Sequence, residues 1–308
     1  MASDSLPPPE TVEQSLRRIR VELTAAGIQE AAGDARRLVA AALDAAATDL
    51  IRDPNRMLTT SEAARLARFV RRRIEREPVS RIFGRREFYG RSFAVTPAVL
   101  DPRPDTETLI DAALAIARSE CWAGRPLTIL DVGTGSGAIV LTLLAELPLA
   151  AGLAIDISRQ ALDCAAANAA ALGLSDRVKF HCHDIFAGFP PGPPGGFNLI
   201  VSNPPYITTA DLATLEPEVA HYDPRLALDG GCDGLAFYRT ILEAWAATLH
   251  LSTAQRALVL ELGAGQSEAV VGIAKNFGAY DALTTLELHR DLGNHIRCVA
   301  ISKQSSAE

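Results

Sequence analysis

The stretch Ile129-Leu130-Asp131-Val132-Gly133-Thr134-Gly135-Ser136-Gly137 joins an apolar strand to the start of a helix. Its three glycines permit backbone angles that other residues avoid, and they let the main chain approach a ligand closely. In open parallel sheets, ligands bind outside the carboxyl ends of the strands. The stretch therefore predicts a nucleotide-type ligand at this turn.

The chain that follows Pro126 alternates between strand and helix patterns. We expect strands at 127–131, 152–156, 178–181, 199–202, 257–261, 284–287 and 297–302, and helices at 137–147, 158–172, 237–249 and 266–276. Strands separated by helices of this length form a mainly parallel sheet with both faces covered. The fold class is therefore α/β, with a Rossmann-like, mainly parallel sheet of seven strands.

The N-terminal part of the chain has a different pattern. Residues 9–78 are rich in alanine and arginine and predict helices from Thr11 to Gly27, over 31–45 and over 61–75, the last with Ser61 as N-cap. Aromatic residues around Tyr89-Gly90 predict a hairpin. We therefore expect a helical bundle at 1–80, a hairpin linker at 81–105 and the α/β domain at 106–308.

Composition indicates an ordinary globular protein. Of the 308 residues, 48% are hydrophobic and 22% are charged, and no apolar run reaches the roughly 20 residues that a membrane span needs. The first residues lack the pattern of a secretory signal. Five scattered cysteines without a Cys-x-x-Cys pair favour reduced thiols. We expect a cytoplasmic protein without a membrane partner.

Charge is divided unevenly along the chain. Residues 1–90 hold 16 basic and 13 acidic residues, whereas the remainder holds 14 basic and 24 acidic ones, a net charge of −10. Such a balance is a poor match to a phosphate backbone. We therefore expect no direct nucleic-acid partner for the larger domain.

The spacing of the glycine turn favours one cofactor class. A dinucleotide fold uses Gly-x-Gly-x-x-Gly, whereas this turn reads Gly-x-Gly-x-Gly with Asp131 just before it. A carboxylate repels a pyrophosphate and attracts a sulfonium or ammonium group. We therefore predict S-adenosylmethionine as cofactor, bound by Asp131, Gly133, Thr134, Gly135 and Gly137.

Two more aspartates follow the next predicted strands. Asp156 follows Gly135 at about the distance at which an acid meets ribose hydroxyls, and Asp184 is placed to accept from the adenine amino group. We expect Ile157 and Ile185, their neighbours, to contact the cofactor as well. His181 and His183 lie nearby, but the other histidines are dispersed, and we predict no metal site.

Asn203-Pro204-Pro205-Tyr206 follows the fourth predicted strand. The prolines stiffen the turn and remove two N–H donors, so the Pro204 carbonyl can point outward. The side-chain carbonyl of Asn203 adds a second hydrogen-bond acceptor, and Tyr206 adds a flat ring. Two acceptors beside a ring suit a planar –NH2 group. We predict that Asn203, Pro204 and Tyr206 act on such a nitrogen, that Pro205 helps to bind it, and that Asn203 also borders the cofactor.

Several segments together resemble the protein-(glutamine-N5) methyltransferases that modify peptide chain release factors. Pro102-Arg103-Pro104-Asp105-Thr106-Glu107 is similar to a family segment except at Asp105, and residues 216–219 and 224–235 also resemble family signatures. The resemblance implies methyl transfer from S-adenosylmethionine to the glutamine of the Gly-Gly-Gln motif in class I release factors. It implies that the helical domain helps to dock the factor. Arg103 and Glu107 are placed to reach the substrate at the rim.

Three alternatives stay open at this point. Asn-Pro-Pro-Tyr suits a flipped adenine equally well, as in an adenine-N6 methyltransferase on DNA or RNA. A glutamine methyltransferase acting on a ribosomal protein is the second alternative. A binding module that has kept only the fold is the third, although the full set of Gly133, Gly135, Asp156 and Asn203 argues against it.

Overall fold

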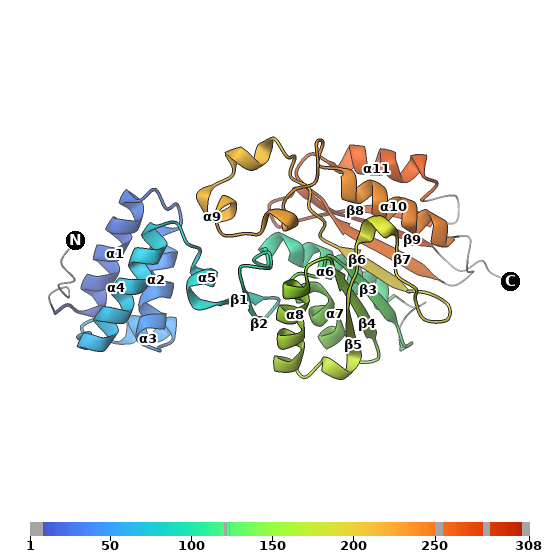
Figure 1. The fold of residues 1–308 in the computed structure, drawn as a ribbon. Coiled ribbons are helices and arrows are strands. Elements are labelled where there is room, and N and C mark those ends of the chain that lie inside the picture. Colours follow the sequence, from blue (N-terminus) through green and yellow to red (C-terminus); the bar gives the residue numbers. More distant parts are fainter. Residues whose placement is uncertain (1–8, 120–121, 123, 250–254, 280–283, 304–308) are drawn as a thin grey trace. The chain divides into compact units, whose positions relative to one another are not determined.

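The computed structural model describes residues 9–119, 122, 124–249, 255–279 and 284–303, which form two compact units (Figure 1). The first unit comprises the chain up to Gly84 together with Pro217–Tyr222. The second comprises Arg85–Glu216 and the chain from Asp223 onward. A short segment of the later chain is therefore part of the helical unit.

The first unit is helical. Its helices are α1 (Val12–Ala25), α2 (Ala31–Ala42), α3 (Ala47–Arg52), α4 (Thr60–Ile74), α5 (Val79–Phe83) and α9 (Pro217–Ala220). The predicted N-cap Ser61 is wrong. The N-cap of α4 is Thr59, whose hydroxyl accepts from Glu62 N while the Glu62 carboxylate accepts from Thr59 N. This reciprocal pair satisfies two N–H groups that a helix start leaves open.

A buried ion network ties Pro217–Tyr222 to the helices of the first unit. The Arg73 guanidinium lies 2.7 Å from Asp34 Oδ2 and 3.0 Å from Glu218 Oε1. Arg76 contacts the other Glu218 oxygen at 2.7 Å. A buried charge is stable only when it is paired, so each member of this network needs the others.

The predicted hairpin opens the second unit. β1 (Arg85–Phe88) and β2 (Arg91–Ala94) pair in antiparallel register, with Phe88 opposite Arg91. Tyr89 and Gly90 both have positive φ, as a two-residue hairpin turn requires. The pattern around Tyr89-Gly90 thus indicated the turn correctly.

The second unit is built on one sheet of seven strands in the order β5-β4-β3-β6-β7-β9-β8. Neighbouring strands are parallel from β5 through β7, and β8 and β9 are antiparallel. The predicted α/β class with a mainly parallel sheet is confirmed. The strands are β3 (Thr128–Val132), β4 (Ala151–Asp156), β5 (Val178–Cys182), β6 (Leu199–Ser202), β7 (Arg256–Glu261), β8 (Thr284–Arg290) and β9 (Ile296–Lys303).

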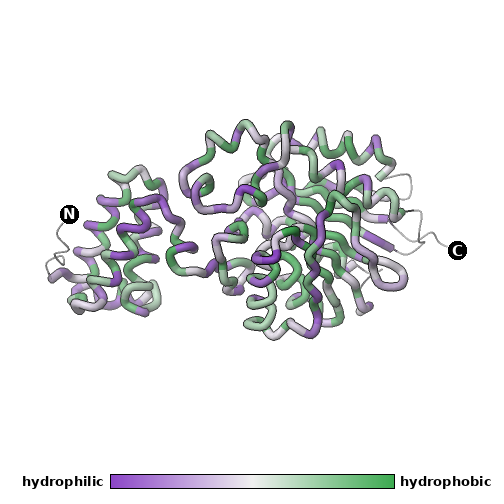
Figure 2. The backbone as a smooth tube through the Cα atoms, in the orientation of Figure 1, coloured by the Kyte–Doolittle hydropathy of each residue, from purple (hydrophilic) through white to green (hydrophobic). Residues whose placement is uncertain are grey.

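Helices cover both faces of this sheet. Along β6, Leu199 and Val201 belong to the apolar core beneath α6 and α7, and Ile200 belongs to the core beneath α10 and α11. The central strands are hydrophobic along their length for this reason (Figure 2). The helices are α6 (Glu107–Ala117), α7 (Ala138–Glu146), α8 (Arg159–Ala171), α10 (Ala236–Leu249) and α11 (Ser267–Asn276).

Five short 3-10 turns complete the described elements: η1 (Pro104–Thr106), η2 (Ser175–Arg177), η3 (Ile185–Ala187), η4 (Asp211–Thr214) and η5 (Arg225–Ala227). No disulfide joins Cys164, Cys182, Cys232 or Cys298, and Cys121 lies outside the described residues. Within the described chain, no helix combines the length and apolar character that crossing a bilayer demands.

Strand order fixes where a ligand can bind. After β3 the chain moves outward through β4 and β5, and it then returns to the other side of β3 with β6. The strand order therefore reverses between β3 and β6. A crevice opens at such a reversal, outside the carboxyl ends of the strands.

Candidate active site

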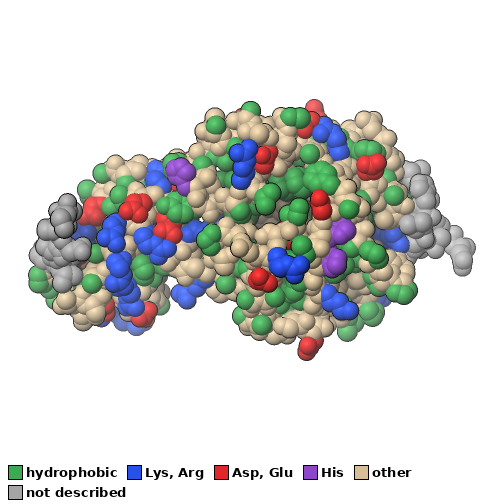
Figure 3. All heavy atoms as spheres, in the orientation of Figure 1, with side chains coloured by type: hydrophobic (Ala, Val, Ile, Leu, Met, Phe, Trp, Pro, Cys, Tyr) green, Lys and Arg blue, Asp and Glu red, His purple; other side chains and the backbone are tan. Residues whose placement is uncertain are grey.

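A cavity of about 440 Å3 lies at this reversal. Hydrophobic side chains gather around the hollow in the space-filling view (Figure 3). Most of its lining comes from segments that directly follow the carboxyl ends of β3, β4, β5 and β6. The lining includes Val132, Gly133, Thr134, Gly135, Asp156, Ile157, Asp184, Ile185, Ser202, Asn203, Pro204 and Pro205.

The glycine turn forms one wall. Gly133 has φ of 71° and Gly135 has φ of 56°, and a Cβ placed on either would meet no atom within 4 Å. Their backbone is therefore open toward a ligand. Gly137 is not among the described lining residues. It is the N-cap of α7, and a Cβ there would lie 3.0 Å from a Leu141 methyl.

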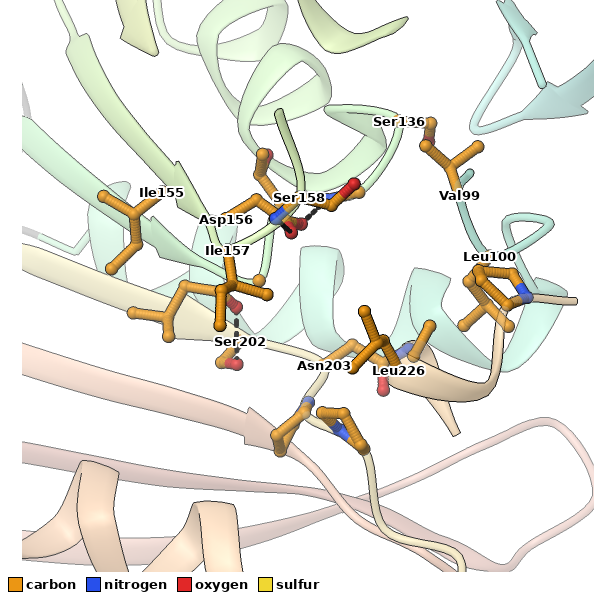
Figure 4. Close-up of a pocket in the computed structure, with 18 of the residues that line it drawn as sticks. Val99, Leu100, Ser136, Ile155, Asp156, Ile157, Ser158, Ser202, Asn203 and Leu226 are labelled. Atoms are coloured by element: carbon orange, nitrogen blue, oxygen red, sulfur yellow. Dashed lines mark hydrogen bonds between the residues drawn. The ribbon is translucent and has the colours of Figure 1, made fainter. Parts of the chain in front are cut away.

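Asp156 holds the turn from the neighbouring strand. Its Oδ2 accepts from Gly135 N at 2.9 Å and its Oδ1 accepts from Ser158 N at 2.9 Å (Figure 4). Burial raises the pKa of this carboxyl above its ordinary value. Each carboxylate oxygen can accept a further bond. Asp156 is therefore able to take ribose hydroxyls while it supports the loop.

Asp184 and Ile185 complete the wall next to Asp156. Asp184 Oδ1 accepts from Phe186 N at 3.0 Å, which leaves the second carboxylate oxygen for another donor. Ile157 lines the cavity with much of its side chain exposed, and Ile185 lines it from a buried position. These four residues lie together, and their contact with a cofactor stays a prediction.

Asp131 lies behind the glycine turn and is not among the described lining residues. It is fully buried, its Oδ2 accepts from Thr134 Oγ1 at 2.7 Å and from Val140 N at 3.3 Å, and burial raises its pKa to about 7. These bonds hold the turn and the first residues of α7. The sequence placed Asp131 against the cofactor cation, but the observed bonds give it a supporting position.

The Asn203-Pro204-Pro205-Tyr206 turn forms the opposite wall. Asn203, Pro204 and Pro205 line the cavity, and Asn203 Nδ2 donates to Thr106 Oγ1 at 3.2 Å. An amide carries its nitrogen and oxygen on opposite branches, so this bond turns the Asn203 oxygen away from Thr106. The close-up shows Asn203 and Leu226 across from Asp156 (Figure 4).

Tyr206 lies at the end of this turn and is not among the described lining residues. Burial raises the pKa of its phenol to about 12. Its backbone carbonyl accepts from Gln266 Nε2 at 3.0 Å. The predicted contact of its ring with a substrate amide therefore stays a prediction, and its observed contribution is to anchor the turn.

Three glycines pack directly against this turn. A Cβ on Gly230 would lie 2.8 Å from Pro205 O, one on Gly234 would collide with Tyr206 O, and one on Gly263 would lie 3.0 Å from the Tyr206 ring. Real Cβ atoms do not tolerate the backbone contacts that would form at Gly230 and Gly234. The glycine-rich segment at 230–234 is therefore a cradle for the turn rather than a free loop.

Arg103 and Glu107 have separate positions. Arg103 lines the cavity, and its guanidinium pairs with Asp223 Oδ2 at 2.6 Å. Glu107 is not among the described lining residues, and its Oε1 accepts from Tyr89 N at 2.9 Å. Arg103 thus lines the cavity, and its contact with a substrate stays a prediction, whereas Glu107 fixes the hairpin to α6.

Sequence reasoning missed the residues that hold Asn203 and Tyr206 in place. Thr106 is the N-cap of α6, Glu261 ends β7 and Gln266 precedes α11. The available signal was two isolated polar residues, Glu261 at the end of an apolar strand and Gln266 directly after Gly263-Ala264-Gly265. The sequence pattern predicts a strand that ends at 261 and a helix that begins at 266, and it assigns these residues no contact with the turn.

The lining chemistry suits a cationic, phosphate-free cofactor. Among the described lining residues, Arg103 is the only Lys or Arg, and it is paired, whereas Asp156 and Asp184 supply two carboxylates. The open backbone at Gly133 and Gly135 provides the close approach that such a ligand needs. The described residues contain no group of three or more His, Cys, Asp or Glu that would hold a metal ion.

Family models match two parts of the chain. One described as the PrmC N-terminal domain matches residues 14–84, and one described as the methyltransferase small domain matches residues 116–221. The first falls on the helical unit. The second includes the glycine turn and the Asn-Pro-Pro-Tyr turn.

Whole-chain comparisons agree with these matches. A release factor glutamine methyltransferase of Bradyrhizobium diazoefficiens is 44% identical over 261 residues, which cover 85% of each chain. The Cereibacter sphaeroides enzyme of that name is 48% identical over 267 residues, 86% of this chain and 90% of that one. The catalytic domain of hMettl16, solved with a MAT2A 3′UTR hairpin, has a TM-score of 0.51 at 15% identity over 82% of this chain and 86% of that chain, a likeness of fold alone.

Proposed function

The chain belongs to the release factor glutamine methyltransferases, and from this premise we propose its cofactor, its target atom and its mechanism. It transfers a methyl group from S-adenosylmethionine to the side-chain amide nitrogen of the glutamine in the Gly-Gly-Gln motif of class I release factors. The product glutamine carries a methyl group in place of one amide hydrogen, and the proton is released to water.

The position of Asn203 carries this proposal. Its side chain lines the same cavity as Gly133 and Gly135, and its nitrogen donates to Thr106. The Asn203 oxygen is therefore the atom available to a substrate –NH2 group. The Pro204 carbonyl, next in the chain, supplies the second acceptor of the pair.

Two acceptors address the difficulty of this reaction. A carboxamide nitrogen is a poor nucleophile because its lone pair is delocalised into the carbonyl. Hydrogen bonds from both N–H groups to Asn203 Oδ1 and Pro204 O fix the amide plane and direct the lone pair. When bound, S-adenosylmethionine supplies an electrophilic methyl group on a cationic sulfur. Holding the reacting atoms in near-attack geometry lowers the barrier further.

We assign the remaining parts as follows. Gly133, Thr134, Gly135, Asp156, Ile157, Asp184 and Ile185 hold the cofactor. Arg103, Pro205 and the segment around Leu226 border the substrate. Residues 1–80 dock the release factor, 81–105 link the domains, and 106–308 catalyse. Because release factors act during translation termination, we place the enzyme in the cytoplasm.

A labelling experiment tests the proposal. The protein is incubated with radiolabelled methyl donor and a purified class I release factor, with parallel samples of DNA, RNA and ribosomal subunits. We expect label on the release factor, and we expect it to vanish when the glutamine of the Gly-Gly-Gln motif is replaced. Label on nucleic acid or ribosomal protein instead would refute the assignment.

Replacing Asn203 gives the sharpest mutational test. Losing a preorganised hydrogen-bonding group in a closed site costs roughly 10²–10³-fold in rate, by analogy with the donors of an oxyanion hole. N203A should therefore lower turnover by about that factor and leave cofactor affinity nearly unchanged, as measured by labelling rate and calorimetry. Turnover equal to that of the unaltered enzyme would remove Asn203 from the mechanism.

A further inference from the structure

Glu261 is a buried carboxyl directly behind the Asn-Pro-Pro-Tyr turn. It ends β7, and its side chain is 2% exposed. In the parallel pairing of β6 with β7, Ser202 lies opposite Leu260, so Asn203 and Glu261 are the next residues on the two strands. Such a carboxyl is costly to bury unless it is paired.

Among the described residues, no ion pair includes Glu261. The guanidinium of Arg297 lowers the pKa of Glu261 by its charge, but it pairs with Asp105 at 3.0 Å and with Asp291 at 2.9 Å. Burial raises the pKa of Glu261 to about 7, and hydrogen bonds from the side chains of Thr106 and Asn203 oppose that rise. One carboxyl oxygen, Oε2, is buried without a hydrogen-bond partner among the described residues.

The hydrogen atoms on Thr106 and Asn203 determine which group donates in each contact. The Thr106 oxygen accepts from Asn203 Nδ2, so its single hydrogen is free to point to Glu261. The Asn203 –NH2 group has two hydrogens, one of which goes to Thr106, and the buried Glu261 carboxyl lies at the adjacent position of the neighbouring strand. The Asn203 nitrogen is thus turned toward Thr106, and its oxygen lies on the opposite branch of the amide.

We propose that Glu261 and Thr106 are positioning residues that lock the Asn203 amide with its nitrogen toward the core and its oxygen toward the substrate. The inference rests on the proposed role of the Asn203 oxygen as an acceptor. Without the lock, the amide rotates by half a turn and presents donors where the substrate also presents donors. Two facing –NH2 groups cannot bond, so each flipped molecule is inactive.

Three substitutions separate positioning from packing. T106V keeps the shape of the side chain and removes the hydroxyl, T106S keeps the hydroxyl, and E261Q replaces one acceptor oxygen with a donor. We expect T106V and E261Q each to lower turnover roughly tenfold, the effect of about one lost hydrogen bond. T106S should restore most of the rate. The cofactor Kd, measured by calorimetry, should stay within about twofold in all three.

A double-mutant cycle with N203A is the deciding experiment, because a residue that acts only through Asn203 has no effect once Asn203 is gone. Single-turnover labelling of the release factor is measured for the unaltered enzyme, T106V, N203A and T106V/N203A. We expect T106V to lower the single-turnover labelling rate about tenfold when Asn203 is present and to leave it unchanged in N203A. An equal loss of rate with and without Asn203, or no loss when Asn203 is present, would overturn the inference.

The controls keep this result independent of folding and of the proposed function. Thermal unfolding of each variant shows whether it is folded. Should T106V not fold, the same cycle with E261Q decides the question in the same terms. Label on the release factor from the unaltered enzyme tests the function itself. An enzyme that labels the factor but ignores T106V and E261Q contradicts only the positioning role.

Discussion

The two turns that meet at the cavity are held by different means. The glycine turn is fixed by nearby strands: Gly133 N donates to Ile155 O at 2.9 Å, Gly135 N donates to Asp156 at 2.9 Å, and the space beside both glycines is open. The Asn-Pro-Pro-Tyr turn is enclosed. Gly230, Gly234 and Gly263 touch its backbone or its tyrosine ring, and Gln266 binds its last carbonyl.

The two turns differ because the cofactor side and the substrate side of the cavity have different structural requirements. The cofactor side needs an open backbone of unusual φ, which glycines at the right spacing supply by themselves. The substrate side needs two acceptors held in fixed directions, and two prolines alone do not fix the position of a turn. Segments distant in the sequence fix the position of the Asn-Pro-Pro-Tyr turn. Substitutions in those segments should therefore lower turnover and leave cofactor affinity nearly unchanged.

The strongest test of this contrast is G234A. The added Cβ collides with Tyr206 O, and Gly234 also has φ of 71°, which an alanine rarely adopts. Displacing the turn by about 1 Å should lower turnover by about 10²-fold. Labelling rate and calorimetry are measured together, and we expect the cofactor Kd to change little.

Gly272 offers a matched control for that variant. It lies in α11, and a Cβ there would meet nothing within 4 Å. G272A should keep full turnover and gain slight stability from the better helix propensity of alanine. If G234A were as active as G272A, the glycine cradle would have no role in the reaction.

The converse test is D156A on the cofactor side. Removing a carboxylate that supports Gly135 N and faces the cavity costs charge-assisted bonds, so we expect cofactor affinity to fall roughly tenfold or more. At saturating cofactor, turnover should recover most of its original value. An unchanged Kd in calorimetry would remove Asp156 from the cofactor site.

The smallest effect is expected from D131N, which probes the carboxyl behind the glycine turn. Asp131 has a folded pKa of about 7, above the value near 3.9 of an unfolded chain. Between these values the folded state binds more protons, so this group lowers stability as the pH rises. Asparagine keeps an acceptor for Thr134 and Val140 and does not titrate.

The measurement is the free energy of unfolding of both proteins by denaturant from pH 5 to pH 7. The stability of D131N relative to the unaltered protein should rise with pH, by on the order of 1 kcal/mol per pH unit. Glu261 is present in both proteins and cancels in the difference. A difference that is constant with pH would show that Asp131 does not titrate in this range.

Sequence patterns predicted the sheet well because they depend on neighbours in the chain. Apolar runs such as Leu199-Ile200-Val201 alternate between two cores, and Tyr89-Gly90 indicates its hairpin by local turn chemistry. Local reasoning was weaker where two polar residues competed. It named Ser61 as N-cap where the structure has Thr59, and it missed the short helices α3 and α5.

The same difference between local pattern and tertiary packing applies to the predicted site residues. Gly133, Gly135, Asp156 and Asn203 line one cavity because parallel strands bring their carboxyl ends to one edge. Asp131, Gly137, Tyr206 and Glu107 follow the same motifs, but they are not among the described lining residues. A motif gives the position of a residue along the chain, whereas the direction of its side chain depends on its packing.

The sequence by itself determined the α/β class, the glycine turn and the stiff Asn-Pro-Pro-Tyr bend, since each arises from backbone preferences within a few residues. Only the tertiary structure decided which group the Asn203 amide contacts. Thr106 lies 97 residues before Asn203 and Glu261 lies on the neighbouring strand, and the hydrogen bond from Asn203 Nδ2 to Thr106 exists only when the sheet has assembled.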